Sequence, residues 1–406
     1  MTEKIKITVI LAMMCVLGSC QNAVSQQGKD DITVACYYFP NYHTRDSSEL
    51  PISRQHFTNW SEWELVKQAK PRFEGHEQPK VPAWGYEDEK DPKVMEKKIK
   101  AAADHDVDVF IFDWYTYEGK PFLNRCLDEG FLQAKNTNDI KFSLMWANHD
   151  WMELYPYTSG TKHDYLYDGK VTSEIFDKIG SDLVSQYFTK PNYWLIDGKA
   201  YFSIYDIQNF INSFGSLEAT LAEMKKLDAK AVKAGLKGIH WNLVAWGQAI
   251  LPGQDAPTNN AELLEKLAFN SATSYVWVHH AGLPKVQTDY NEVRGVYMQH
   301  WDKVKNEYKV PYYPNVSMGW DPSPRTNQNK EWHGNEGYPY SYTMGNNTPQ
   351  NFKAALQLTK EKLLKDPKGP RVLTINCWNE WTEGSYLEPD TKNGMGYLEA
   401  VKAVFK

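Results

Sequence analysis

Residues 374–384 read TINCWNEWTEG, and here the chain passes from an apolar strand directly into an aromatic and acidic cluster. A buried carboxylate is costly unless it has partners or a chemical role. Glycosidic cleavage needs one protonated carboxyl and one ionised carboxylate facing the same bond. A solvated loop would give these two acids no role, but the flanking Trp378 and Trp381 favour a walled pocket. We therefore predict Glu380 and Glu383 to be catalytic.

The runs that precede this strand predict the fold. Stretches with helical period separate short runs rich in β-branched and aromatic residues, the pattern of repeated βα units around a parallel sheet. Eight runs occur, at residues 32–38, 107–113, 141–148, 200–206, 239–246, 272–278, 314–320 and 372–378. Helices are predicted at residues 93–105, 172–188, 217–234, 261–268, 292–308, 349–365 and 396–405. The sequence thus predicts an α/β fold, a single (β/α)8 TIM barrel over residues 31–406, with runs apolar on both faces.

Two connections are too long for simple turns, residues 40–91 after the first strand and residues 321–348 after the seventh. Both follow strands, so they belong to the face on which barrel enzymes place their active sites. Polar and aromatic residues at the strand ends reach the same face, where aromatic rings can stack on sugars and amides or carboxylates can hold hydroxyls. The predicted substrate-binding residues are Tyr38, Asp113, Trp114, Asn148, Asp150, Trp246, Trp277, Trp320, Asn379 and Trp381.

The first twenty residues have the layout of a secretory signal. Lys4 and Lys6 precede an apolar run, residues 7–17, that is too short to span a bilayer. The run ends in Leu-Gly-Ser-Cys at residues 17–20, which resembles the cleavage box of bacterial lipoproteins. We expect residues 1–20 to be a signal peptide, Cys20 to be lipidated and residues 21–30 to be a polar tether. The protein is then an exported lipoprotein of the cell envelope that meets a membrane only through its anchor.

The composition of the chain limits the classes of molecule that it can be expected to bind. The formal net charge is −6, which argues against nucleic acid, and 14% of the residues are aromatic, which suits a carbohydrate substrate. Three cysteines, Cys36, Cys126 and Cys377, remain after processing, an odd number. Cys36 and Cys377 fall in the first and last strands, so we expect them to be neighbours and free thiols. The chain has no Cys/His zinc spacing, and we expect no metal and no cofactor.

Several segments resemble a known family. Residues 379–384, NEWTEG, followed by Leu387-Glu388-Pro389, resemble the signature that closes the catalytic domain of glycoside hydrolase family 99, the endo-α-mannosidases. Residues 37–42, 112–115 and 145–151 are closer to the WbsX-like branch of that superfamily. The resemblance implies a retaining hydrolase in which Glu380 deprotonates the 2-hydroxyl of the sugar and Glu383 is the acid and then the base. Thr382 stands where the mannosidases usually have His, which puts the identity of the sugar in doubt.

Two other functions stay open from the sequence. WbsX proteins have been proposed to be glycosyltransferases, and Asp106-Val107-Asp108 has the form of their metal-binding DxD motif. That motif precedes the second strand, however, and so falls on the face opposite the chemistry. The third candidate is a surface lipoprotein that binds glycans without cleaving them. It would keep the aromatic rim and would not need paired acids.

Overall fold

The computed structural model describes residues 31–45, 59–152, 156–161, 165–257 and 259–406. Cys20 and the tether lie outside these residues, so the lipid anchor stays a prediction. Residues 32–406 form one compact unit. None of the described helices is long and apolar enough to cross a bilayer.

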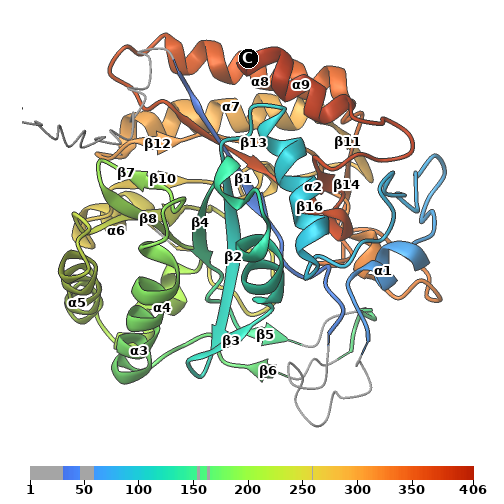
Figure 1. Ribbon diagram of the computed structural model, residues 1–406. Coiled ribbons are helices and arrows are strands. Elements are labelled where there is room, and N and C mark those ends of the chain that lie inside the picture. The colour runs from blue at the N-terminus through green and yellow to red at the C-terminus, as the bar shows by residue number, and fades with distance from the viewer. Residues whose placement is uncertain (1–30, 46–58, 153–155, 162–164, 258) are drawn as a thin grey trace, which may run out of the picture. The chain divides into compact units, whose positions relative to one another are not determined.

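The unit is built on a nearly closed barrel of parallel strands (Figure 1). In spatial order these are β12 (Tyr312–Tyr313), β10 (Ser271–Thr273), β9 (Ile239–Val244), β8 (Lys199–Ile204), β4 (Lys141–Trp146), β2 (Val109–Tyr117), β1 (Thr33–Tyr38), β15 (Val372–Asn376) and β13 (Asn315–Ser317). The two outermost segments, β12 and β13, are separated in sequence only by Pro314. Proline has no N–H to donate, which interrupts the strand there. Nine segments therefore occupy the eight predicted strand positions, and the predicted barrel is confirmed.

The strand register joins the two ends of the chain. Cys36 of β1 lies opposite Ile375 of β15 on one side and Phe110 of β2 on the other. Cys36 and Cys377 are buried free thiols on neighbouring strands, as predicted. Because the last strand pairs with the first, the residues that follow β15 are held beside those that follow β1.

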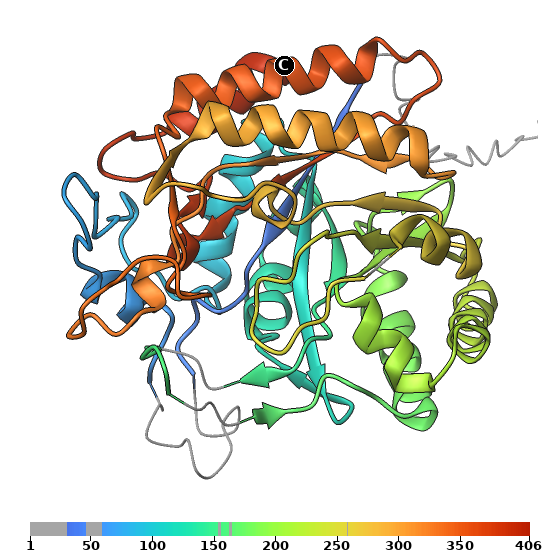
Figure 2. The ribbon, with the colours of Figure 1, turned by 180° about the vertical axis from the view of Figure 1, so that it is seen from behind.

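Helices cover the outside of the barrel. They are α1 (Trp63–Gln68), α2 (Pro92–Ala103), α3 (Ser173–Leu183), α4 (Ile207–Phe214), α5 (Leu217–Lys233), α6 (Asn260–Lys266), α7 (Tyr290–Glu307), α8 (Pro349–Leu364) and α9 (Gly396–Phe405). In both views α7, α8 and α9 lie together along one side, and α3, α4 and α5 along another (Figures 1 and 2). Seven of these were predicted. The short α1 was not, because it lies inside the long connection after the first strand, and neither was the short α4, which lies between the predicted strand 200–206 and the predicted helix 217–234.

Short elements decorate this frame. Two short strands pair with barrel strands, β3 (Lys120–Phe122) with β2 and β7 (Leu195–Ile196) with β8. Short strands also pair with one another, β5 (Trp151–Met152) with β6 (Tyr165–Tyr167) and β11 (Gln287–Asp289) with β14 (Thr343–Gly345). A further such pair, β16 (Asn379–Glu380) with β17 (Ser385–Tyr386), contains one predicted catalytic residue. Single helical turns replace a full helix between β2 and β4, namely η3 (Cys126–Gly130), η4 (Phe131–Gln133) and η5 (Thr137–Asp139), and η6 (Val184–Phe188) extends α3.

The barrel interior differs from the apolar filling that the sequence predicted. Small polar side chains face inward and are buried, and they bond to one another across strands. Ser203 donates to Asn242, which donates to Ser271, at 3.0 and 2.9 Å. Thr273 and Thr374 lie 3.2 Å apart through their hydroxyls. A buried polar group is tolerated when its hydrogen bonds are made inside the protein, and these cross-strand pairs meet that condition.

Candidate active site

A pocket opens at the C-terminal ends of the barrel strands, and both predicted catalytic residues line it. Its walls come from almost every strand end, including Phe39 after β1, Asp113 in β2, Tyr205 after β8 and Tyr275 after β10. Glu380 ends β16, and Glu383 ends the single turn η9 (Trp381–Glu383). The turn closes on Gly384, whose φ of 65° is in the left-handed region that glycine adopts without strain. This sharp turn is what lets two acids three positions apart face the same space.

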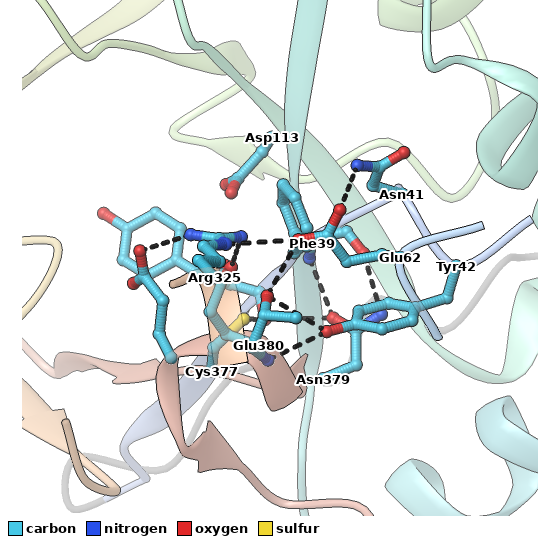
Figure 3. A network of polar contacts seen from close by, with 12 residues as sticks. Phe39, Asn41, Tyr42, Glu62, Asp113, Arg325, Cys377, Asn379 and Glu380 are labelled. Carbon is cyan, nitrogen blue, oxygen red and sulfur yellow. Dashed lines mark hydrogen bonds and ion pairs between the residues drawn. The ribbon is translucent and has the colours of Figure 1, made fainter. Parts of the chain in front are cut away.

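One guanidinium joins the two carboxyls. Arg325 ends the turn η8 (Ser323–Arg325) in the long loop after β13, and its Nη2 donates to Glu380 Oε1 at 2.7 Å while Nη1 donates to Glu383 Oε1 at 2.5 Å. Its Nε donates to a third carboxylate, Glu62, at 3.1 Å. The hydroxyl of Tyr338 donates to Glu383 Oε1 at 2.6 Å. Figure 3 shows Arg325 between Glu380 and Glu62. A planar fork with several donors is suited to holding carboxylates in fixed positions.

Glu62 is itself fixed from behind. Asn41 donates to its Oε2 at 2.9 Å, and the Thr382 hydroxyl donates to its Oε1 at 3.0 Å. Thr382 stands where the resemblance leads one to expect His, and its role here is to bind Glu62. The residue that departs from the family pattern thus has a structural role within the turn η9 (Trp381–Glu383).

A second connection runs through a tyrosine. The hydroxyl of Tyr275 lies 2.9 Å from Asp113 Oδ2 and 3.1 Å from Glu380 Oε2. A phenol has one proton to donate. The three groups are therefore satisfied best when one of the two carboxyls is protonated. Asp113 is 3% exposed, and its Oδ1 has no hydrogen-bond partner among the described residues.

The electrostatics favour protonated carboxyls in this pocket. Burial raises the pKa of Glu380 well above its ordinary value and the charge of Glu383 raises it further, while Arg325 lowers it. Burial also raises the pKa of Glu383, although Arg325 and the Tyr338 hydroxyl lower it. The pKa of Asp113 is raised well above its ordinary value by burial, with a hydrogen bond from Tyr275 acting against the rise. Desolvation disfavours the charged form, so the pocket can keep a carboxylic acid neutral for proton donation.

A separate cluster lies behind the catalytic turn, and we call it the rear cluster: Lys98, Glu89 and Glu388. Lys98 Nζ lies 2.5 Å from Glu89 Oε1 and 2.5 Å from Glu388 Oε1. Glu388 accepts the indole N–H of Trp378 at 2.9 Å and that of Trp381 at 2.7 Å. The rear cluster therefore holds the tryptophans on both sides of Glu380.

Asn379 links the rear cluster to the first strand. Its amide donates to Glu89 at 2.9 Å and to the carbonyl of Phe39 at 2.8 Å, and its oxygen accepts the Phe39 N–H at 2.8 Å. The residue before Glu380 is thus tied to the residue after β1, on the side away from the pocket.

The structure divides the predicted substrate-binding residues into two groups. Asp113, Asp150 and Trp320 line the pocket with Glu380 and Glu383. The others do not line it: Tyr38, Trp114, Asn148, Trp246, Trp277, Asn379 and Trp381. Asp113 and Trp114 are neighbours in β2 and point to opposite faces of the strand, so only Asp113 reaches the pocket.

The residues outside the pocket have structural partners. Tyr38 and Trp381 bond to the rear cluster, and Asn148 bonds to the backbone of Asp206. The indoles of Trp246 and Trp277 donate to the carbonyls of Tyr205 and Asn315. Trp114 is buried and packs edge-on against Tyr187. The sequence identified the strand ends correctly, but it did not reveal which face each side chain takes.

The strand-end positions of His149, Trp151 and His279 predict that they reach this face, and all three line the pocket. Sequence reasoning did not identify the other pocket residues Phe39, Asn41, Tyr115, Tyr205, Tyr275 and Arg325. It also missed Glu62 and Tyr338, which bind Arg325 or the catalytic pair. For Arg325 the available signal was its place in the long loop after the seventh strand, which the sequence marks as functional. Glu62 lies in the first long loop, which carries the same signal, but the sequence does not distinguish it from the other charged residues of that loop.

No three His, Cys, Asp or Glu side chains in the described parts of the chain gather in a way that could hold a metal ion. The DxD motif at residues 106–108 precedes β2, and Asp108 accepts the backbone N–H of Val34 at 2.8 Å. It lies at the N-terminal end of the barrel strands, away from the pocket.

The fold and the site define a class, a (β/α)8 barrel with paired acids at the C-terminal ends of its strands. The sequence matches the family described as Glycosyltransferase WbsX over residues 34–401, so the chain belongs to this family. A curated relative is the uncharacterized protein WxcX of Xanthomonas campestris pv. campestris (strain B100), 24% identical over 372 residues. The match covers 91% of this chain and 49% of that protein, so the chain spans about half the length of that relative.

Solved structures show the same fold. The GH99 endo-alpha-mannosidase from Bacteroides thetaiotaomicron in complex with BIS-TRIS-propane has a TM-score of 0.53 at 14% identity, over 91% of this chain and 95% of that one. A glycoside hydrolase-like protein has a TM-score of 0.58 at 14% identity, over 93% and 94%. These likenesses place the fold with the TIM barrels of glycoside hydrolases, and with the family match they confirm the predicted resemblance.

Proposed function

We propose that this protein hydrolyses glycosidic bonds in a polysaccharide or oligosaccharide, with Glu380 and Glu383 as its catalytic carboxyls. The observation that carries the proposal is the pair of buried acids bridged by Arg325 on the pocket wall. Retaining and inverting hydrolysis both need such a pair beside the scissile bond. A protein that only bound glycans would have no use for two coupled acids with raised pKa values.

The proposed reaction retains configuration through the 2-hydroxyl of the sugar. Glu380 takes the proton of that hydroxyl while the 2-oxygen of the sugar attacks C1, and the bond from C1 to the leaving oxygen breaks. Glu383 gives its proton to the leaving oxygen, and the product is a 1,2-anhydro sugar. Water then attacks C1 and the bond from C1 to the 2-oxygen breaks, while Glu383 takes a proton from the water and Glu380 returns its proton to the 2-oxygen.

The contacts support these separate roles. Both hydrogen bonds to Glu383 described above fall on Oε1, which makes Oε2 the oxygen for proton donation. Glu380 is bound on both oxygens, and its Oε2 meets the Tyr275 hydroxyl, which a sugar hydroxyl can replace. Without substrate, burial and the neighbouring charges raise the pKa of Glu380 more strongly than that of Glu383. The proposed roles therefore require the proton to move to Glu383 when substrate binds.

Three substrates or variants test this route. Glu383→Gln is expected to abolish turnover of natural glycans and to spare a substrate whose leaving group needs no proton, because only acid assistance is lost. Glu380→Gln is expected to damage both. Removing the 2-hydroxyl from a good substrate should prevent cleavage by the unmodified enzyme. Efficient hydrolysis of that 2-deoxy substrate would sink the anhydro-sugar route, and full activity of both Gln variants would sink the site.

The second candidate is a glycosyltransferase, favoured by the description of the family. Such an enzyme would hold the diphosphate of a nucleotide sugar, a task for basic side chains or a bound cation. Of the described residues that line the pocket, Arg325 is the one arginine or lysine, and carboxylates already engage it. Sugar transfer from nucleotide-sugar donors to an acceptor, without new reducing ends in glycans, would favour the transferase.

We further propose that the protein is an exported lipoprotein anchored through Cys20, on the signal-like sequence of residues 1–20. Cys20→Ala should release the protein from the membrane fraction. A variant that still sediments with membranes would overturn the anchor while leaving the proposed chemistry untouched.

A further inference from the structure

A second pocket, which we call the side pocket, adjoins the catalytic pocket. The two share His149, Asp150, Leu251 and Pro252, so one extended molecule can occupy both. The remaining walls of the side pocket come from Asp206, the first turns of α4 and residues 253–255 of the loop after β9. The proposed chemistry does not involve the side pocket, and Asp150 is the one predicted site residue among its described lining residues.

The charged side chains that line the two pockets are acidic, with the exception of Arg325 and apart from the histidines. Asp113, Asp150, Glu380 and Glu383 line the catalytic pocket, and Asp150 is joined by Asp206 and Asp255 in the side pocket. The described lining of the side pocket contains no lysine or arginine. The positive charge of Arg325 in the catalytic pocket is already shared among Glu62, Glu380 and Glu383.

The histidines in these walls add no positive charge at neutral pH. Burial lowers the pKa of His279 to about 4, although the hydrogen bond that its Nδ1 donates to the Gln248 carbonyl acts against the shift. Burial also lowers the pKa of His149. Burial raises the pKa of Asp206 to about 6, and the charges of Asp150 and Asp255 contribute to the rise. The aspartates of the side pocket therefore already repel one another without any ligand.

The same walls are rich in hydrogen-bond acceptors. An ionised carboxylate only accepts hydrogen bonds, and a protonated carboxyl keeps acceptor capacity beside its one donor. The buried Asp113 Oδ1 lacks a partner in the described part of the chain. A ligand that donates hydrogen bonds satisfies such walls, as sugar hydroxyls and ammonium groups do. A carboxylate, sulfate or phosphate on the ligand would bring like charges together, and like-charge contacts are a strong means of rejecting a wrong partner.

We propose that the side pocket binds a neighbouring sugar of the glycan held at Glu380 and Glu383, and that the two pockets together accept sugars bearing hydroxyls or an ammonium group and exclude uronates, sulfates and phosphates. The position of this sugar beside the scissile bond rests on the proposed hydrolase function. The selection by charge does not, because it can be measured as binding alone.

The first experiment compares matched polysaccharides with the full chain. A panel of uronate-containing polysaccharides is used in native form and after chemical reduction of the carboxyls to alcohols, with neutral polysaccharides alongside. Binding is measured by retardation in affinity gels and cleavage by new reducing ends. We expect the reduced form of at least one polysaccharide to bind or react about tenfold or more better than the native form. Equal or stronger binding of the native acidic forms overturns the proposal, and so does the absence of binding to every neutral or reduced form.

The second experiment places the selection in the side pocket. Asp255 is an exposed residue on the wall of the side pocket. Substituting it changes the charge of that wall and leaves Glu380 and Glu383 in place. Asp255→Lys should reduce the preference for the carboxyl-reduced form several-fold, and Asp255→Asn should do so less. The matched control is Glu361→Lys, the same charge change at an exposed position of α8 outside both pockets. An equal effect of Glu361→Lys, or no effect of Asp255→Lys, overturns the assignment to this pocket.

The outcomes separate the two proposals. Charge-selective binding that depends on Asp255, without new reducing ends from any bound glycan, supports the side pocket and rejects hydrolysis. Cleavage whose rate changes neither on carboxyl reduction of the glycan nor in Asp255→Lys supports hydrolysis and rejects the proposed selection of charge by the side pocket.

Discussion

Two buried ionic clusters lie on opposite sides of the same short turn. The rear cluster has one ammonium between two carboxylates, and the pocket side has one guanidinium among three. In the rear cluster Glu388 accepts a tryptophan N–H on each of its oxygens. On the pocket side Glu380 and Glu383 face open space as well as Arg325. The difference indicates that the rear cluster holds the turn in place, and that the pocket side keeps acceptor and donor capacity for a ligand.

The titration of the two clusters differs accordingly. Burial alone would lower the pKa of Lys98, but Glu388 and Glu89 raise it above its ordinary value, so the ammonium keeps its proton. Burial raises the pKa of Glu89, Lys98 lowers it and Glu388 raises it. Arg325 likewise lowers the pKa values of Glu380 and Glu383, yet both stay raised. In each cluster the cation lowers the pKa of a neighbouring acid without returning it to its ordinary value.

Exchanging one acid on each side should give the largest contrast. Glu383→Gln is expected to reduce turnover of natural glycans by about 10²–10⁴-fold, the usual contribution of a general acid. Its stability should change little, since a Gln oxygen can still accept from Arg325 and Tyr338. Glu388→Gln should instead destabilise the fold by about 1–3 kcal/mol, because an amide N–H then faces an indole N–H. Glycan turnover and denaturant unfolding of the two variants, measured side by side, check this; equal loss of stability in both would remove the distinction.

Removing the rear cation should be the most damaging change to stability. Lys98→Met leaves two buried carboxylates uncompensated, and breaking a buried pair in this way costs about 3–5 kcal/mol. Burial already raises the pKa of Glu89, and without Lys98 its folded pKa should lie further above its unfolded value. The loss should then be small below about pH 4, where the carboxyl is mostly protonated in both states, and should grow as pH rises toward 8. Urea unfolding at several pH values measures it, and a loss that does not depend on pH contradicts this explanation.

A third buried acid connects the two long loops. Burial alone would raise the pKa of Asp321, but hydrogen bonds from His76 and Gln78 and the charge of His76 lower it to about 2. A carboxyl with a lowered pKa stabilises the fold above its unfolded pKa near 4 and loses that contribution as pH falls to about 2. Asp321→Asn should therefore cost about 2–3 kcal/mol at neutral pH and progressively less below pH 4. Thermal unfolding measured from pH 7 to pH 2 should show the stabilities of the unmodified protein and Asp321→Asn converging as pH falls. A constant difference between the two proteins would contradict a stabilising ion pair between Asp321 and His76.

The smallest predicted effect concerns the pocket cation. Because Arg325 lowers the pKa values of both catalytic acids, Arg325→Met should shift the pH profile of kcat/KM to higher pH, by about one unit or more. Arg325→Lys keeps the charge and should restore most of the profile while losing the bidentate geometry. A profile that stays in place in the Met variant would mean that the guanidinium only positions the acids.

The sequence was most informative where a local pattern has one structural outcome. The alternation of apolar runs and helical stretches specified the barrel, and the polar cluster after the last strand specified a turn that carries two acids on the pocket wall. It was least informative on the direction of single side chains. Tyr38 and Phe39 are neighbours at the end of β1, yet Tyr38 bonds to Glu89 behind the turn and Phe39 lines the pocket. A one-residue difference in register reverses the face, and no local signal fixes it.

The sequence by itself determined the number and order of the strands, the end of the barrel that carries the chemistry and the two acids on the turn after the last strand. These depend on local periodicity and on the short-range chain path. Only the tertiary structure brought Arg325 and Glu62, 263 residues apart, onto the same carboxyl pair. It also decided which tryptophans anchor the turn and which residues form the side pocket. Contacts between distant loops depend on how the barrel closes, and closure is a property of all the strands together.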